Sequence, residues 1–352
     1  MTALRDSLIR QIAAQGPITV AEYMTTCLLH PQHGYYTTRD PFGAQGDFVT
    51  APEISQMFGE MLGLCVAQAW LDQGSPAPFT LAELGPGRGT LMADILRATR
   101  AVPGFHDAAR LHLIEASPVL RRRQATALPD PQFHDSADTL PDAALFLVAN
   151  EFFDALPIRQ FLRAGDGWRE RMVGLQGGTL AFGLGPVTHL DALEHRLADT
   201  TEGQMVETCA SAPPVMAALA RRIAQHGGAA VIVDYGDWRS RGDTFQALHQ
   251  HAPDDPLAHP GQADLTAHVD FEALARAAHP LHATALTPQG VFLERLGITQ
   301  RAQSLARTLD GAALQAHVAA HRRLTHPQEM GHLFKVLGLH PHAAPAPPGL
   351  DP

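Results

Sequence analysis

The hydrophobic pattern divides this chain into three regions with different predicted structures. Residues 1–75 carry apolar positions at helical spacing over 4–12 and 54–70, which predicts an N-terminal helical segment that serves as a lid. Residues 76–340 alternate short apolar runs with helical patterns and form the predicted core. Residues 341–352 are rich in proline and alanine, and we expect a flexible tail there.

Short apolar, β-prone runs in the core region predict buried strands, each followed by a helical pattern. This alternation favours an α/β fold with a largely parallel sheet and right-handed crossovers. Two later runs are expected to form an antiparallel closing pair. The expected strands are 79–84, 111–114, 133–135, 144–149 and 229–233, with 282–286 and 333–339 as the closing pair.

Two insertions interrupt the core. The insertion at about 161–212 alternates apolar residues over 161–184 around the turns AGDG and QGGT, which predicts β-hairpins, and a helix is expected over 213–225. The second insertion, at about 237–269, is polar and contains proline. Insertions at the carboxyl ends of strands cover the ligand crevice in doubly wound sheets.

The most informative motif is LAELGPGRGTL, in which glycines follow the first strand at alternate positions: Gly85, Gly87 and Gly89. Glycine lets the backbone turn tightly and approach a ligand closely. The dinucleotide fingerprint G-x-G-x-x-G is not met, because its third place is Thr90. An acidic strand residue, Glu83, before G-x-G-x-G is similar to the S-adenosylmethionine turn of Rossmann-like methyltransferases; the alternative is an ordinary glycine-rich connection.

Acidic residues also follow the next two expected strands. Glu115 ends the second strand, the position that receives ribose hydroxyls in nucleotide-binding sheets, although the helix dipole also favours an acid there. Asp135 follows the third strand and could meet an adenine edge, but aspartate is equally common in turns.

The segment ANEFFDALPIRQF leaves the fourth strand, which should lie beside the first at the switch point where ligands bind. Asn150 offers an amide for cofactor binding at this point, and Glu151 and Asp154 offer carboxylates among apolar neighbours. Such acids are either paired or functional; the alternative is helix capping with an ion pair to Arg159 or Arg163.

These acids suit a methyl transfer to arginine. The reaction is an in-line displacement, so the enzyme must align the nucleophile, exclude water and manage a proton. A planar guanidinium favours bidentate carboxylate partners. Glu151 and Asp154 are the first candidates for that role, and Asp47 and Glu53 are the second.

Composition narrows the function further. The formal net charge of −10 argues against general nucleic-acid binding, and no apolar run reaches membrane-spanning length. Three distant cysteines form neither a disulfide framework nor a zinc motif. The 20 histidines are scattered, often in loops such as His249, His251 and His259, and we expect no metal ligand among them.

Seven motifs together resemble the MidA family, which includes the mitochondrial complex I assembly-factor methyltransferase. The resemblance runs over about residues 18–339 and implies a Rossmann-like, S-adenosylmethionine-dependent fold. It also implies symmetric dimethylation of arginine on a complex I subunit. The motifs are GYY, PFGAQGDFVTAPEISQMFGE, LAELGPGRGTLMADILR, NEFFDALPIRQF, VDYG, DLTAHVDF and MGHLFKVLGL.

The resemblance carries the glycine turn, Glu115 and the motif of Asn150, Glu151 and Asp154 over to the site, with Gly46, Asp47 and Phe48 as part of a lid. A protein arginine methyltransferase is the first hypothesis. An assembly or chaperone protein that binds S-adenosylmethionine without catalysis is the second, and a small-molecule methyltransferase is the third.

Partner and location remain expectations at this point. The start of the chain shows neither a signal peptide nor an evident mitochondrial presequence, so we expect a cytoplasmic protein of a bacterial source, or a matrix protein if the source is eukaryotic. The expected partner is a protein that presents an arginine. A homodimer is also considered, because residues 54–70 are apolar over much of the helix surface; a helix buried within the chain would look the same.

Overall fold

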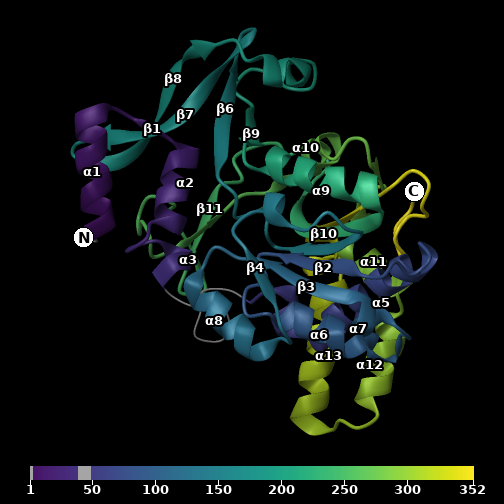
Figure 1. Ribbon diagram of the computed structural model, residues 1–352. Coiled ribbons are helices and arrows are strands. Elements are labelled where there is room, and N and C mark those ends of the chain that lie inside the picture. Colours follow the sequence, from purple (N-terminus) through teal and green to yellow (C-terminus); the bar gives the residue numbers. More distant parts are fainter. Residues whose placement is uncertain (1–2, 39–48) are drawn as a thin grey trace. The chain divides into compact units, whose positions relative to one another are not determined.

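Residues 3–38 and 49–352 are described by the structure, a computed structural model in which the chain divides into two units (Figure 1). Three separate stretches make up each unit. The first unit comprises Met1–Phe48, Asp154–Ala212 and Arg239–Asp270, and the second comprises Val49–Phe153, Pro213–Trp238 and Phe271–Pro352.

The second unit is built on the predicted α/β sheet, with the strand order β15-β17-β10-β5-β2-β3-β4. The strands from β10 to β4 are parallel, and β17 runs antiparallel to β10. β15 and β16 pair antiparallel with β17, which gives the predicted closing group. The strands are β2 (Phe79–Leu84), β3 (Ala109–Ile114), β4 (Gln132–His134), β5 (Leu145–Asn150), β10 (Gly228–Asp237), β15 (His282–Ala283), β16 (Thr287–Pro288) and β17 (Phe334–His340).

The switch point of this sheet lies at β2. Leu84 at its end is level with Ile114 of β3 on one side and with Ala149 of β5 on the other. The residues that follow these three strand ends therefore come from one edge of the sheet, which is where ligands bind in folds of this kind.

Helices of the second unit bury the apolar faces that the sequence pattern predicts. α5 packs Phe58, Met61 and Leu62 into the same core as Phe146 of β5. The helices are α4 (Ala51–Ile54), α5 (Gln56–Asp72), α6 (Thr90–Ala98), α7 (Phe105–Ala108), α8 (Pro118–Ala127), α9 (Ala212–His226), α10 (Phe271–Ala277), α11 (Gln289–Arg295), α12 (Ile298–Ala306), α13 (Gly311–Thr325) and α14 (Met330–Leu333). Among the described residues, no helix combines the length and the apolar character needed to cross a membrane.

The first unit is organised by an antiparallel sheet with the order β1-β7-β6-β9, in which β8 pairs with β7. The two predicted hairpins are confirmed, since β6, β7 and β8 are consecutive and antiparallel. Two helices contribute Leu8 and Met24 to a core that includes Val173 of β7. The elements are α1 (Ala3–Gln15), β1 (Ile18–Thr19), α2 (Val20–Leu29), α3 (Tyr35–Thr38), β6 (Ile158–Ala164), β7 (Gly167–Gln176), β8 (Thr179–Thr188), β9 (Met205–Cys209) and the three-stranded sheet of β11 (Gln246–His249), β12 (Ala252–Asp254) and β13 (Asp264–Thr266).

Two boundaries differ from the sequence expectation. Residues 1–75 do not form one segment, because α5 packs its apolar residues into the core of the second unit. Residues 341–352 do not behave as a frayed tail, because Leu350 is buried in that same core and Arg295 donates to Asp351 at 2.9 Å. Most apolar residues of α5 are buried within the chain, with Leu64 and Leu71 exposed, so burial within the chain accounts for most of the apolar surface that suggested a homodimer.

Candidate functional site

The glycine turn after β2 takes the backbone through left-handed conformations that favour glycine. Gly85, Gly87 and Gly89 have φ angles of 60°, 53° and 80°. A β-carbon on Gly85 would also lie 2.9 Å from Cδ2 of Phe152, so a side chain at this position would force the ring to move. The turn then leads into α6, whose first residue is Thr90.

A fully buried glutamine connects this turn to the acid after β3. Nε2 of Gln124 donates to the carbonyl oxygen of Gly87 at 2.7 Å and to Oε2 of Glu115 at 3.2 Å. Oε1 of Glu115 accepts from the backbone N–H of Ser117 at 2.7 Å. Burial raises the pKa of Glu115, and the hydrogen bonds from Ser117 and Gln124 oppose that rise. Glu115 is therefore held in a fixed orientation beside the glycine turn.

Glu83 is a buried acid one residue before the end of β2. Burial, together with the charge of Glu115, raises the pKa of Glu83 to about 8, against the opposing backbone hydrogen bond from Met92. Within the described part of the chain, Oε2 of Glu83 and Oδ1 of Asn150 are buried without a hydrogen-bond partner. Buried polar atoms are normally satisfied, so this pair indicates a place where a polar ligand completes the hydrogen bonding.

Glu151 lies directly after β5 in a left-handed conformation, with a φ angle of 49°. This conformation is uncommon for residues other than glycine and is held by surrounding contacts. Oε1 of Glu151 accepts from the backbone N–H of Ala51 at 3.1 Å and from Nδ2 of Asn150 at 3.1 Å. The first contact ties the segment after β5 to the start of α4.

Glu53 approaches the glycine turn from α4. Its Oε1 accepts from the hydroxyl of Thr90 at 2.5 Å, and its Oε2 lies 3.8 Å from Nη1 of Arg88. Both partners belong to the sequence GPGRGT, residues 85–90, whose last residue begins α6. Both acids therefore involve α4 (Ala51–Ile54): Glu53 belongs to this helix, and Glu151 accepts a hydrogen bond from its first residue.

Asp234, at the end of β10, supports the segment that carries Glu151. Its Oδ2 accepts from the backbone N–H groups of Phe152 at 3.2 Å and Phe153 at 3.0 Å, and its Oδ1 accepts from that of Tyr235 at 2.9 Å. The side chain is wholly buried. Its place at a parallel strand end, in the VDYG motif, is the sequence signal that could have identified it.

The remaining predicted residues lie elsewhere. Asp135 points outward, with 90% of its side chain exposed, and pairs with Arg121 at 2.5 Å, so the structure favours a surface ion pair over an adenine contact. Asp154 belongs to the first unit and is buried. Asp47, with Gly46 and Phe48, lies outside the described residues.

The surroundings of Asp154 are acidic and aromatic. Burial raises the pKa of Tyr36, and the charges of Asp264 and Asp154 raise it further. The Tyr36 hydroxyl donates to Oδ1 of Asp264 at 2.7 Å. Arg159, proposed from the sequence as an ion-pair partner of this acid, forms a bidentate pair with Glu170 instead, with hydrogen bonds of 2.7 and 2.6 Å.

The second unit therefore offers a coherent set of ligand-binding groups. Its strand ends provide a tight glycine turn, an oriented carboxylate, and two buried polar oxygens that have no hydrogen-bond partner among the described residues. Negative charge on Glu115, with Glu83 beside it, suits a ligand that carries hydroxyl and cationic groups. A nucleoside with a positively charged substituent has both kinds of group.

Comparison with known proteins agrees with this chemistry. Residues 61–289 match a family described as "Putative S-adenosyl-L-methionine-dependent methyltransferase". The chain is 37% identical to the mitochondrial protein arginine methyltransferase NDUFAF7 of Homo sapiens, over 97% of this chain and 84% of the human protein. Its identity to the NDUFAF7 protein of Xenopus laevis is also 37%, over 97% of this chain and 85% of the frog protein.

A solved structure from Burkholderia thailandensis, bound to S-adenosylhomocysteine, is 30% identical to this chain. It superposes with a TM-score of 0.81 over 99% of this chain and 93% of the bacterial one. The sequence-based prediction of the fold and of the family is thereby confirmed. The chain belongs to the S-adenosylmethionine-dependent methyltransferase family that matches residues 61–289.

Proposed function

We propose that this methyltransferase methylates an arginine side chain of a protein. The observation that carries the proposal is a group of features at one edge of the sheet: the glycine turn, Glu115 with its hydrogen bond from Gln124, and the buried oxygens of Glu83 and Asn150, for which residues 3–38 and 49–352 supply no hydrogen-bond partner. The choice of a protein arginine as acceptor is supported by the names of relatives that are 37% identical over almost the whole chain.

The donor site is assigned to side chains of the second unit. Glu115 accepts the two ribose hydroxyls, and Glu83 and Asn150 complete the polar contacts of the donor's amino acid portion. Gly85, Gly87 and Gly89 let the backbone come close to it. Bound S-adenosylmethionine supplies a methyl group on a positively charged sulfur, which needs no further activation, so the protein's task is alignment and exclusion of water.

The acceptor site requires carboxylates that orient a guanidinium and take up its charge. Glu53 and Glu151 are the strongest candidates within the second unit, since both are tied to α4 beside the glycine turn. Asp154, and Asp47 outside the described residues, are the other proposed acids. Bidentate carboxylate contacts would fix the planar guanidinium so that one nitrogen faces the methyl group.

The finer parts of the proposal rest on family resemblance. Symmetric dimethylarginine is the proposed product, and a subunit of respiratory complex I is the proposed partner. The relatives are named as mitochondrial proteins. For this chain we propose a cytoplasmic location in a bacterium, or the mitochondrial matrix in a eukaryote.

The test is methyl transfer from labelled S-adenosylmethionine. Purified full-length protein is incubated with donor and a lysate from cells that lack it, and labelled proteins are hydrolysed for amino acid analysis. Label in dimethylarginine of a protein supports the proposal. Label only in small molecules would favour the third hypothesis, and donor binding without any label would favour a non-catalytic assembly protein.

Two variants sharpen this test. Glu53→Gln and Glu151→Gln are expected to lower the rate of methyl transfer while S-adenosylmethionine still binds, because both residues are assigned to the site that binds the substrate arginine. The matched control is Glu194→Gln, since Glu194 is an exposed acid of the first unit. Unchanged transfer in both variants would remove these two acids from the proposal and leave Asp154 and Asp47.

A further inference from the structure

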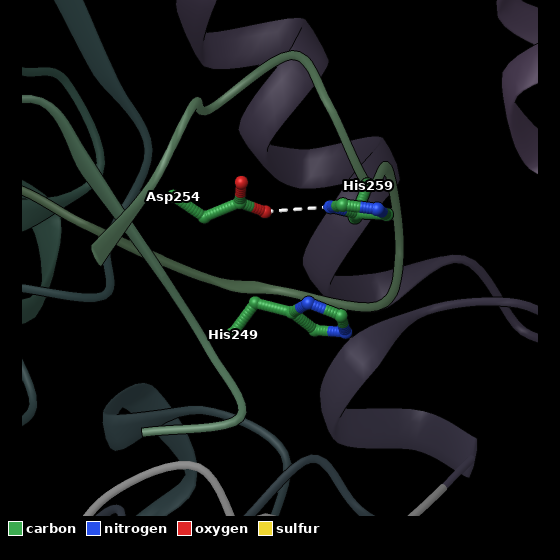
Figure 2. Close-up of side chains that lie close together, drawn as sticks. All are labelled: His249, Asp254 and His259. Carbon is green, nitrogen blue, oxygen red and sulfur yellow. Dashed lines mark hydrogen bonds and ion pairs between the residues drawn. The ribbon is translucent and has the colours of Figure 1, made fainter. Parts of the chain in front are cut away.

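Two of the loop histidines singled out in the sequence come together with an aspartate in the first unit. His249, Asp254 and His259 each offer one ligand atom, and these three atoms lie within 4.8 Å of one another. Nδ1 of His259 lies 2.6 Å from Oδ2 of Asp254, and the rings of His249 and His259 stack with centroids 4.5 Å apart (Figure 2). The three residues come from β11, the end of β12 and the loop that follows it.

The donor set selects a class of metal ion. Two imidazole nitrogens and one carboxylate oxygen suit Zn²⁺ and neighbouring divalent transition metals, whereas Ca²⁺ and Mg²⁺ favour sites composed of oxygen atoms. Three protein ligands in a tetrahedral site leave a fourth position for water. The side chains are only partly exposed, at 43% for His259 and 21% for Asp254, so an ion there would be reachable and partly shielded.

The backbone that carries His249 and Asp254 is fixed by a tight hairpin. His249 is level with Ala252 across the β11–β12 pair. The two residues between them, Gln250 and His251, have positive φ angles of 52° and 62°. This is the conformation of a two-residue turn of the type that matches the twist of paired strands, and it holds the ends of both strands together.

The loop that carries His259 is anchored independently to the helices of the first unit. The Tyr23 hydroxyl of α2 donates to the carbonyl of Pro256 at 2.6 Å, and Leu257 is buried in the core. Gly261 packs so closely that a β-carbon would lie 2.3 Å from the carbonyl oxygen of His33. The separation of the three side chains is therefore set by well-supported backbone, which lowers the entropy cost of binding an ion.

We propose that His249, Asp254 and His259 form a binding site for a divalent transition-metal ion, with Zn²⁺ as its reference ligand. Ion binding replaces the His259–Asp254 hydrogen bond. By exchange with solvent the ring proton moves from Nδ1 to Nε2, which leaves the imidazole neutral and frees the Nδ1 lone pair for the ion. The two rings, now 22° from parallel, turn about their side-chain torsions so that a nitrogen of each faces the ion. The bound ion links β11, β12 and the following loop, and so stabilises this part of the first unit.

The experiment measures binding of Zn²⁺ and Co²⁺ alone to the full chain after treatment with a chelator. Calorimetry and cobalt absorption give affinity and stoichiometry, and thermal unfolding with and without Zn²⁺ gives the stabilisation. His249→Ala, Asp254→Asn and His259→Gln are each expected to weaken binding by about tenfold or more. They should also remove the metal-dependent rise in Tm.

The matched control is His251→Ala, because His251 is an exposed histidine of the same hairpin. It should bind the ion as the unaltered chain does, and this separates the proposed site from binding to scattered surface histidines. Circular dichroism in chelator verifies that each variant is folded. Equal affinity in the unaltered chain and the three site variants, or no binding at all, would overturn the proposal and leave a histidine–aspartate pair of structural value only.

Discussion

The carboxylate of Asp234 accepts a hydrogen bond from the backbone N–H of Phe152, 3.2 Å away and 82 positions earlier in the chain. The same oxygen accepts from Phe153, and the other oxygen accepts from Tyr235. Asp234 thereby joins the end of β10 to the segment after β5. Since Phe152 directly follows Glu151, this contact helps to hold Glu151 in its left-handed conformation.

Replacing Asp234 should weaken both the fold and the site. Asp234→Asn turns one acceptor into a donor that faces a backbone N–H group, and leaving a buried group unsatisfied costs about 1–3 kcal/mol. We expect the free energy of unfolding to fall by about that amount in urea titrations, and methyl transfer to fall as well. Asp107→Asn, at an exposed position of the same unit, is the control. Equal stability of the two variants would contradict the structural role of Asp234.

Glu83 predicts a specific dependence of stability on pH. Its pKa rises from 4.5 to about 8 in the folded chain, chiefly through burial, so the folded state binds a proton more tightly than the unfolded state. The stability from protonated Glu83 is fully present below pH 4.5 and is lost as pH rises through 8. Compared with that of Glu83→Gln, the free energy of unfolding of the unaltered chain should therefore fall by up to about 1.4 kcal/mol per pH unit between pH 4.5 and about 8.

Urea titrations of both proteins at several pH values measure this difference. Glu115→Gln provides a second arm, because removing the charge of Glu115 should lower the pKa of folded Glu83. The loss of stability should then end at a lower pH and be smaller in total. The unaltered chain should lose stability relative to Glu83→Gln as the pH rises. If the difference between the two proteins does not change with pH, or if the unaltered chain gains stability instead, the pKa of Glu83 is not raised.

The same group links donor binding to proton release. A cationic donor placed near the buried Oε2 of Glu83, which lacks a hydrogen bond within the described part of the chain, favours the ionised carboxylate and lowers its pKa. At pH 7 the unaltered chain should therefore release a proton when S-adenosylmethionine binds. Calorimetry in two buffers with different ionisation enthalpies measures that release, and Glu83→Gln should reduce it while Glu194→Gln should not. Identical proton release in all three proteins would separate Glu83 from the donor.

Local sequence patterns were sufficient to predict the strands whose ends carry the candidate site. The strand at 79–84, the glycine turn and Glu115 follow from short-range periodicity, and parallel strands necessarily bring their carboxyl ends to one edge. Contacts between distant positions were not accessible in this way. The Glu151–Ala51 bond spans 100 positions, and nothing near either residue indicates the other.

The first unit shows the same limit on a larger scale. It is assembled from three separate stretches, so the helix over 4–12 and the hairpins over 161–184 were predicted correctly as elements while their association was not. β1 has only two residues and is stabilised by pairing with β7, which no local pattern records. For the same reason His249 and His259 were interpreted from the sequence as scattered loop histidines, and Asp254 was not singled out. The hairpin and the loop that follows it place the three side chains together.

Gln124 provides the last prediction, because its one amide nitrogen serves both Gly87 and Glu115 from a fully buried position. Gln124→Leu keeps a side chain of similar bulk but removes the N–H groups that hydrogen-bond to the carbonyl of Gly87 and to the carboxylate of Glu115. This loss should lower the free energy of unfolding by about 1–3 kcal/mol. It should also weaken S-adenosylmethionine binding by about tenfold, since Glu115 loses its orientation.

The companion variant Gln124→Glu distinguishes orientation from loss of volume. It keeps the size of the side chain but places a second carboxylate beside Glu115, so donor binding should weaken at neutral pH and recover in part as the pH is lowered and the acids share a proton. Arg122→Leu, at an exposed position of the same helix, controls for general effects on α8. Donor affinity that is unchanged in Gln124→Leu and Gln124→Glu would show that Glu115 reaches its position without this bridge.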